Sequence, residues 1–246
     1  MNDVWGAFLL SALAGSATVA GCLIALVLKQ EHEGLIAFLS AFAAGVMLYG
    51  AMTEIFKKGT AALQEEFSPK AALGISALAF FSGIAFLLLL SRFLPEEDAR
   101  RRTAVFVFLS LTLHNFPEGL ATFLSALSSP SLAAPMVCAI ALHNIPEGLA
   151  VSVPMMRAGK SRRVAFFYSV FSGAAEPLGA AFGAFVLLPV LSGAWLGLLF
   201  SFAAGLMAYL SLFELLPDTL AVTKNGTVLG YISGMATMAL SLILFL

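Results

Sequence analysis

The sequence predicts an all-α polytopic membrane protein with eight transmembrane helices. Of its 246 residues, 60% are hydrophobic and only 11% are charged, whereas soluble domains are nearer one quarter charged. A spanning helix needs about 20 mostly apolar residues, and the chain divides into eight apolar runs of about that length. Backbone polar groups in lipid must be satisfied within the chain, so each run is expected to be a helix.

The eight expected spans form one transmembrane domain covering residues 1–246. Charged residues, glycines and prolines interrupt the hydropathy between them. The spans are 4–28, 34–56, 71–94, 104–127, 132–156, 163–188, 194–216 and 226–246. A short loop, 95–103, follows the third span, and Lys57, Lys58 and Pro217 are expected in the connections between spans.

The basic residues predict how the chain is oriented. Ten lysines and arginines follow the first, third, fifth and seventh spans, against three on the other side. The positive-inside rule therefore places those four loops in the cytoplasm and both termini outside, in a plasma (inner) membrane. The net charge of −1 gives no basic footprint, so nucleic acid is not an expected partner.

An internal repeat links the second and seventh spans. Phe-Ala-Ala-Gly-x-Met-x-Tyr begins at Phe42 and again at Phe202, and each copy is followed by a glutamate, Glu54 or Glu214. The two spans cross in opposite directions, which predicts an inverted repeat of spans 1–3 and 6–8 around a central pair, spans 4 and 5. Shared small-residue packing between helices is the alternative explanation.

A second repeat supplies chemistry in spans 4 and 5. His-Asn-Phe-Pro-Glu-Gly-Leu-Ala at 114–121 matches His-Asn-Ile-Pro-Glu-Gly-Leu-Ala at 143–150 at seven of eight positions. Residues four apart share a helix face, so each histidine is expected beside the glutamate of its own motif. The candidate metal ligands are His114, Asn115, Glu118, His143, Asn144, Glu147 and, from span 6, Glu176.

Three of these carboxylates, Glu118, Glu147 and Glu176, are expected at one depth near the bilayer midplane. Buried carboxylates without counter-charges repel one another, and we expect no lysine or arginine within the spans. A divalent cation, or two bridged by the glutamates, would resolve that conflict. Imidazole with carboxylate, without thiolate, suits Zn²⁺, Fe²⁺, Mn²⁺, Co²⁺ or Ni²⁺ rather than Cu⁺.

Prolines and glycines follow the ligands in both motifs. Pro117 and Pro146 lack an N–H and free a carbonyl one turn earlier, which is expected to kink each helix. Gly119 and Gly148 are expected to let another backbone approach closely. Pro177 follows Glu176 in the same way.

With these motifs, the chain resembles the ZIP (zinc- and iron-regulated transporter-like) family, most closely its bacterial broad-specificity branch. The resemblance covers all eight spans. It implies a mid-membrane two-metal site, one metal held by His114, Glu118, His143 and Glu147, the other by Asn115, Glu118, Asn144, Glu147 and Glu176. It also implies spans 1, 4, 5 and 6 moving against 2, 3, 7 and 8, and a homodimer. Unlike many relatives, the 95–103 loop contains no histidine.

The resulting hypothesis is uptake of Zn²⁺, and of Fe²⁺, Mn²⁺, Co²⁺ and Cd²⁺, into the cytoplasm by alternating access. The metal is the cargo, the bilayer is the other partner, and no organic cofactor is expected. An intramembrane metalloenzyme and a proton- or sodium-coupled carrier of organic solutes remain alternatives. Glu54, Glu214 and Asp218 are either part of an access path or solvated helix caps, and His32 is either a solvated turn or a metal acceptor.

Overall fold

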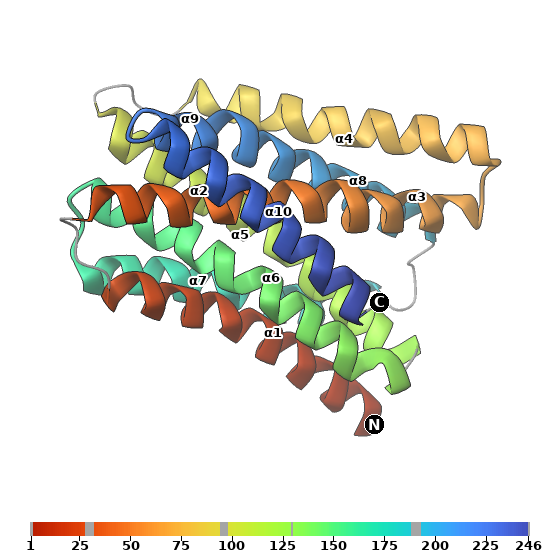
Figure 1. The fold of residues 1–246 in the computed structure, drawn as a ribbon. Coiled ribbons are helices and arrows are strands. Elements are labelled where there is room, and N and C mark those ends of the chain that lie inside the picture. Colours follow the sequence, from red (N-terminus) through yellow and green to blue (C-terminus); the bar gives the residue numbers. More distant parts are fainter. Residues whose placement is uncertain (1, 28–31, 94–97, 129, 188–192, 246) are drawn as a thin grey trace.

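The computed structural model describes residues 2–27, 32–93, 98–128, 130–187 and 193–245, and Figure 1 shows these residues as a bundle of long helices. No described residue lies in a β-strand. The α-helices are α1 (Asn2–Val27), α2 (Glu33–Gly50), α3 (Phe56–Gln64), α4 (Pro69–Ser91), α5 (Ala99–Ser128), α6 (Pro130–Arg157), α7 (Arg162–Phe182), α8 (Gly193–Tyr209), α9 (Leu216–Leu220) and α10 (Lys224–Phe245).

Short π-helical segments join some of these elements. Ala51–Ile55 joins α2 to α3, Leu210–Leu215 joins α8 to α9, and Gly183–Leu187 extends α7. The described chain therefore has eight continuous helical segments. Six are long and apolar enough to cross a membrane: Val4–Val27, Glu33–Gln64, Pro69–Ser91, Arg100–Leu124, Gly193–Leu220 and Lys224–Leu244. The all-helical class is confirmed, while eight crossings and the inverted repeat stay predictions.

Two helices continue beyond the predicted spans. The helix of the second span continues from residue 56 to Gln64, and that of the seventh from 216 to Leu220. Hydropathy falls at Lys57 and Lys58, but the helical hydrogen bonding continues through them, so placing both lysines outside the helix was wrong. Pro217 lies in the first turn of α9, where a missing N–H is tolerated, so its assignment to a connection was also wrong.

The 95–103 loop is shorter than predicted. Residues 95–97 lie outside the described chain, and α5 already begins at Ala99. The side chain of Asp98 accepts hydrogen bonds from the backbone N–H groups of Arg100 and Arg101, at 3.0 and 3.3 Å. An aspartate that caps the first turn in this way favours helix initiation. Glu31 of the predicted turn around His32 is likewise outside the described residues, and His32 itself is exposed.

The helices pack as two groups. In the first group, α1, α5, α6 and α7 contact one another. In the second group, α2 contacts α8, α9 and α10, while α8 also contacts α3 and α4. The groups meet chiefly where α6 contacts α2 and where α5 contacts α8. Figure 1 shows that α1 begins and α10 ends at one end of the bundle, which we call the terminal end.

Candidate metal centre

Four side chains from α5 and α6 converge inside the bundle. His114, Glu118, His143 and Glu147 each offer one nitrogen or oxygen, and these four atoms lie within 4.8 Å of one another. His114 Nε2 lies 3.1 Å from a Glu118 oxygen and 3.6 Å from Glu147 Oε1. His143 Nε2 lies 3.5 Å from the same Glu147 oxygen. Both i, i+4 pairs therefore share a face as predicted, and Glu147 contacts the histidine of the other motif as well.

The cluster is almost closed to solvent but poorly satisfied. Glu147 is 0% exposed, and His114 and His143 are 1% and 2% exposed. Among the described residues, neither oxygen of Glu147 and neither Nδ1 of the two histidines has a hydrogen-bond partner. Buried polar groups are nearly always paired, so these donor atoms require a ligand or water, and a divalent cation suits them.

The two asparagines of the motifs are anchored by their amide nitrogens. Asn115 Nδ2 donates to the carbonyl of Ser172 on α7 at 3.2 Å. Asn144 Nδ2 donates to the carbonyl of Ala14 on α1 at 2.9 Å. Because backbone carbonyls can only accept, these bonds fix each amide with its oxygen directed elsewhere. Both Oδ1 atoms are buried without a partner among the described residues, so they are free to coordinate a cation.

Glu176 on α7 joins the site through an asparagine. It is fully buried, and its Oε1 accepts from Asn144 Nδ2 at 2.5 Å. Its Oε2 has no hydrogen-bond partner in the described part of the chain. Asn115, Asn144 and Glu176 thus present three unpaired oxygens beside the His–Glu cluster. Their role as ligands of a second metal stays a prediction.

The helices approach most closely at the glycines of the motifs. A Cβ placed on Gly119 would collide with the carbonyl oxygen, Cα and carbonyl carbon of Glu176. A Cβ on Gly148 would collide with the carbonyl of Thr18 on α1. The predicted close approach is confirmed at both positions, and at Gly119 it sets where the Glu176 backbone lies.

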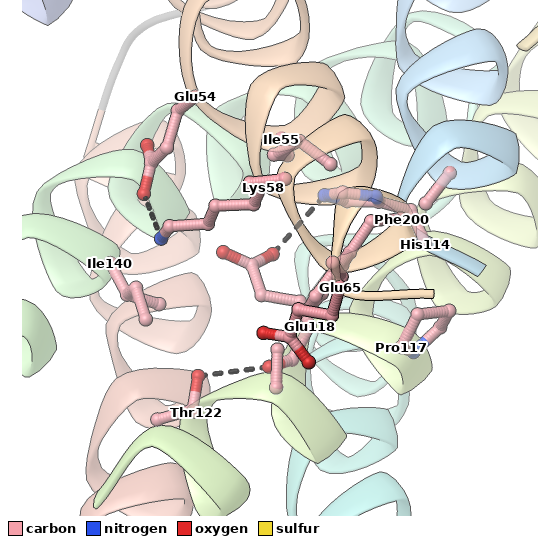
Figure 2. A pocket seen from close by; sticks show the side chains of 14 residues that line it. Glu54, Ile55, Lys58, Glu65, His114, Pro117, Glu118, Thr122, Ile140 and Phe200 are labelled. Atoms are coloured by element: carbon pink, nitrogen blue, oxygen red, sulfur yellow. Dashed lines mark hydrogen bonds and ion pairs between the residues drawn. The ribbon is translucent and has the colours of Figure 1, made fainter. Parts of the chain in front are cut away.

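A cavity of about 300 Å³ reaches this site from the terminal end of the bundle. Figure 2 shows side chains of α3 and α5 around it, among them Lys58, His114 and Glu118. Lys58 extends across it, and its Nζ lies 2.7 Å from Glu54 Oε1. Glu54 is 9% exposed and borders the cavity rather than forming a solvated cap. We call this space the access cavity.

The other side of the site is packed with apolar side chains. On α5, Phe106 and Leu111 precede His114, and on α6, Val151 follows Glu147, so they lie toward the end opposite the termini. These residues belong to one buried cluster with Met47 of α2 and Met207 of α8. We call these five residues the hydrophobic plug, and each is at most 1% exposed. The site is therefore open toward the terminal end and closed toward the opposite end.

Glu214 and Asp218 do not join the cluster. Glu214 lies in the π segment Leu210–Leu215 and accepts a 3.4 Å hydrogen bond from Thr103 of α5. Asp218 forms an ion pair with Arg157 at the end of α6. Both lie at the end of the bundle opposite the termini, where the ion pair connects the two helix groups.

Sequence reasoning missed three contributors to the site. The carbonyls of Ala14 and Ser172 left no signal, because any residue type supplies a carbonyl. Lys58 could have been identified from the sequence, since it lies four residues after Glu54 and faces the same way on a continuous helix. The expectation that no basic residue lies within the spans was therefore wrong, and Lys58 lines the same cavity as Glu118.

Several known proteins that are similar to this chain are named zinc transporters. The family model described as "ZIP Zinc transporter" matches residues 95–242. The chain is 42% identical to the zinc transporter ZupT of Streptococcus mutans, over 100% of this chain and 99% of that protein. It is 39% identical to the ZupT of Clostridium perfringens, over 100% and 98%, and 42% identical to that of Chlorobaculum parvum, over 100% and 99%. The chain belongs to the ZIP zinc transporter family.

Proposed function

We propose that this protein carries Zn²⁺, and with it Fe²⁺, Mn²⁺, Co²⁺ and Cd²⁺, across a membrane into the cytoplasm. One observation carries the proposal: two imidazoles and two carboxylates meet within 4.8 Å of one another inside an apolar helix bundle. Buried ionisable groups in a membrane protein mark an ion path. The names of the relatives, all zinc transporters, support the same cargo.

The donor set suits a transported rather than a permanently held metal. Structural zinc sites usually have four closed ligands, often thiolates. Here the ligands are imidazoles, carboxylates and amide oxygens, and Glu118 remains 11% exposed to the access cavity. We propose a binuclear site in which Glu118 and Glu147 bridge a first metal, bound by His114 and His143, and a second, bound by the oxygens of Asn115, Asn144 and Glu176.

The shape of the bundle supports alternating access. The access cavity reaches the site from the terminal end, while the hydrophobic plug closes the other side. Opening that side requires the two helix groups to separate there, because the plug takes residues from both. We therefore propose that α1, α5, α6 and α7 move against the other helices, exposing the site to each side in turn.

Orientation and assembly complete the proposal. The excess of basic residues at the end opposite the termini favours that end in the cytoplasm, so the access cavity faces outside. We propose eight crossings in one transmembrane domain of a plasma (inner) membrane, related by the inverted repeat. The π segments at 51–55 and 210–215 support the repeat, because each contains the glutamate that follows the repeated motif. A homodimer is a separate prediction, tested by the mass of the purified protein in detergent.

Uptake by proteoliposomes tests the function. Glu118→Gln and Glu147→Gln keep the side-chain shape and remove the charge, and each is expected to abolish Zn²⁺ and Cd²⁺ uptake. Glu66→Gln is the matched control, because Glu66 is exposed and, among the described residues, its one hydrogen bond is accepted from the Ala194 N–H, which glutamine can also accept. Wild-type vesicles that take up no metal, or Glu147→Gln vesicles that transport normally, would refute the proposal.

A further inference from the structure

Lys58 is a basic side chain built into the access cavity. Its ammonium group lies 2.7 Å from Glu54, and the two residues share the lining of the cavity with His114 and Glu118. Glu54 is almost completely buried, whereas the Lys58 side chain is 40% exposed. The ammonium group therefore lies in the same cavity through which a cation would reach Glu118.

We propose that Lys58 is a tethered counter-cation that sets the affinity of the access cavity for divalent metals. It neutralises Glu54, so that Glu54 and Glu118 do not together bind a divalent cation tightly in the access cavity. The inference rests on the proposed function. A conducting path must attract its ion and still let it leave, and two free carboxylates in a half-closed cavity would hold a divalent cation too tightly to pass it on.

The charge count shows the size of the effect. With Lys58 in place, Glu54, Glu118 and Lys58 together carry a charge of −1. Without the ammonium group the same three residues carry −2, and Glu65, which also lines the cavity, adds the same −1 in both cases. The interaction energy of a divalent ion changes by twice the amount that a monovalent ion would experience. For charges separated by a few ångströms in a partly hydrated site, this corresponds to a change in affinity on the order of tenfold.

The arrangement at the opposite end of the bundle differs in a way that supports this role. Asp218 stands four residues after Glu214, as Lys58 stands four residues after Glu54. Asp218 is neutralised by Arg157 from α6, across the boundary between the helix groups. Lys58 and Glu54 belong to one continuous helical segment. That pair moves as a unit, so Glu54 keeps its counter-charge when the groups move.

The test is the concentration dependence of Zn²⁺ and Cd²⁺ uptake into proteoliposomes. Lys58→Met removes the charge and keeps the length, and we expect the half-saturating metal concentration and the maximal rate both to fall, the former about tenfold. Lys58→Arg should behave like the wild type. Glu54→Gln combined with Lys58→Met restores the charge of −1, and should return the half-saturating concentration to near the wild-type value.

Lys57→Met is the matched control, because Lys57 is exposed and is not among the residues that border the access cavity. It should leave both parameters unchanged. If Lys58→Met is not recovered folded, Lys58→Gln is expected to give the same result. The role of Lys58 would be overturned if Lys58→Met left the half-saturating concentration unchanged, or if Lys58→Met and the double variant gave the same value. Either result, with normal wild-type uptake, would leave the transport function supported. Loss of wild-type uptake would instead refute that function.

Discussion

Replacing Gly119 with alanine should damage the site without touching any proposed ligand. An added Cβ would meet three backbone atoms of Glu176, and a backbone cannot rotate away as a flexible side chain can. Overpacking of this kind costs about 1–3 kcal/mol, and the upper half of that range applies where backbone atoms collide. The gain in helix propensity from glycine to alanine is about 1 kcal/mol, so the collision dominates.

Two measurements should register the collision. For a chain of this length, 1 kcal/mol corresponds to roughly 2–4 °C in melting temperature, so a loss of several degrees is expected for the purified protein. The collision also displaces Glu176, which accepts from Asn144 at 2.5 Å. Misplacing a group that orients metal ligands typically costs about 10–100-fold in metal affinity or activity, and metal uptake should fall by that factor.

Gly74→Ala provides the comparison. Gly74 lies in α4, and a Cβ there would meet nothing within 4 Å. This variant should retain full uptake and be as stable as the wild type, or slightly more so. Equal melting temperatures and equal uptake for the Gly119 and Gly74 variants would show that α5 and α7 are not in backbone contact, and would refute the reasoning.

Three further outcomes are expected. Asn144→Leu removes a donor with two buried acceptors, and uptake should fall about 10–100-fold in the proteoliposome assay. Zn²⁺ at 100 times its dissociation constant should stabilise the purified protein by about 2.7 kcal/mol, seen as a rise in melting temperature that His143→Ala suppresses. Asp218→Asn removes the ion-pair partner of Arg157 and should make separation of the two helix groups easier by about 0.2–1 kcal/mol, the usual contribution of such a pair. A cysteine introduced at Val151, in the hydrophobic plug, should then react with a thiol reagent up to about fivefold faster. An unchanged rate would show that the ion pair does not hold the two groups together.

The repeated motif allowed much of the metal centre to be predicted. Residues four apart on a helix share a face whatever surrounds them, so the pairing of His114 with Glu118 and of His143 with Glu147 follows from local geometry alone. Convergence of the two pairs required tertiary information. The matched depth of the carboxylates in antiparallel spans indicated that the two pairs converge, because carboxylates buried on separate faces would each lack a group that neutralises their charge.

The supporting contacts could not be predicted in the same way. Asn115 and Asn144 were expected as ligands, but their amide nitrogens bind the carbonyls of Ser172 and Ala14. Every residue has a carbonyl, so the partner depends on which turn of α7 or α1 lies beside the motif. That register is set by close packing at glycines, including Gly119 and Gly148, and small residues occur at every helix contact in membranes.

The error at Lys58 has a specific physical cause. Hydropathy marks where a chain becomes polar, whereas a helix ends where its hydrogen bonds end, and the two boundaries coincide only when the polar residues face bulk water. Lys58 instead faces the access cavity inside the bundle and is paired with Glu54. A charge just beyond an apolar run, four residues after a buried carboxylate, is therefore better interpreted as part of an internal ion pair than as the start of a loop. The same spacing after Glu214 leads to Asp218, whose counter-charge comes from another helix, so the two halves of the repeat share a backbone pattern but differ in how their carboxylates are neutralised.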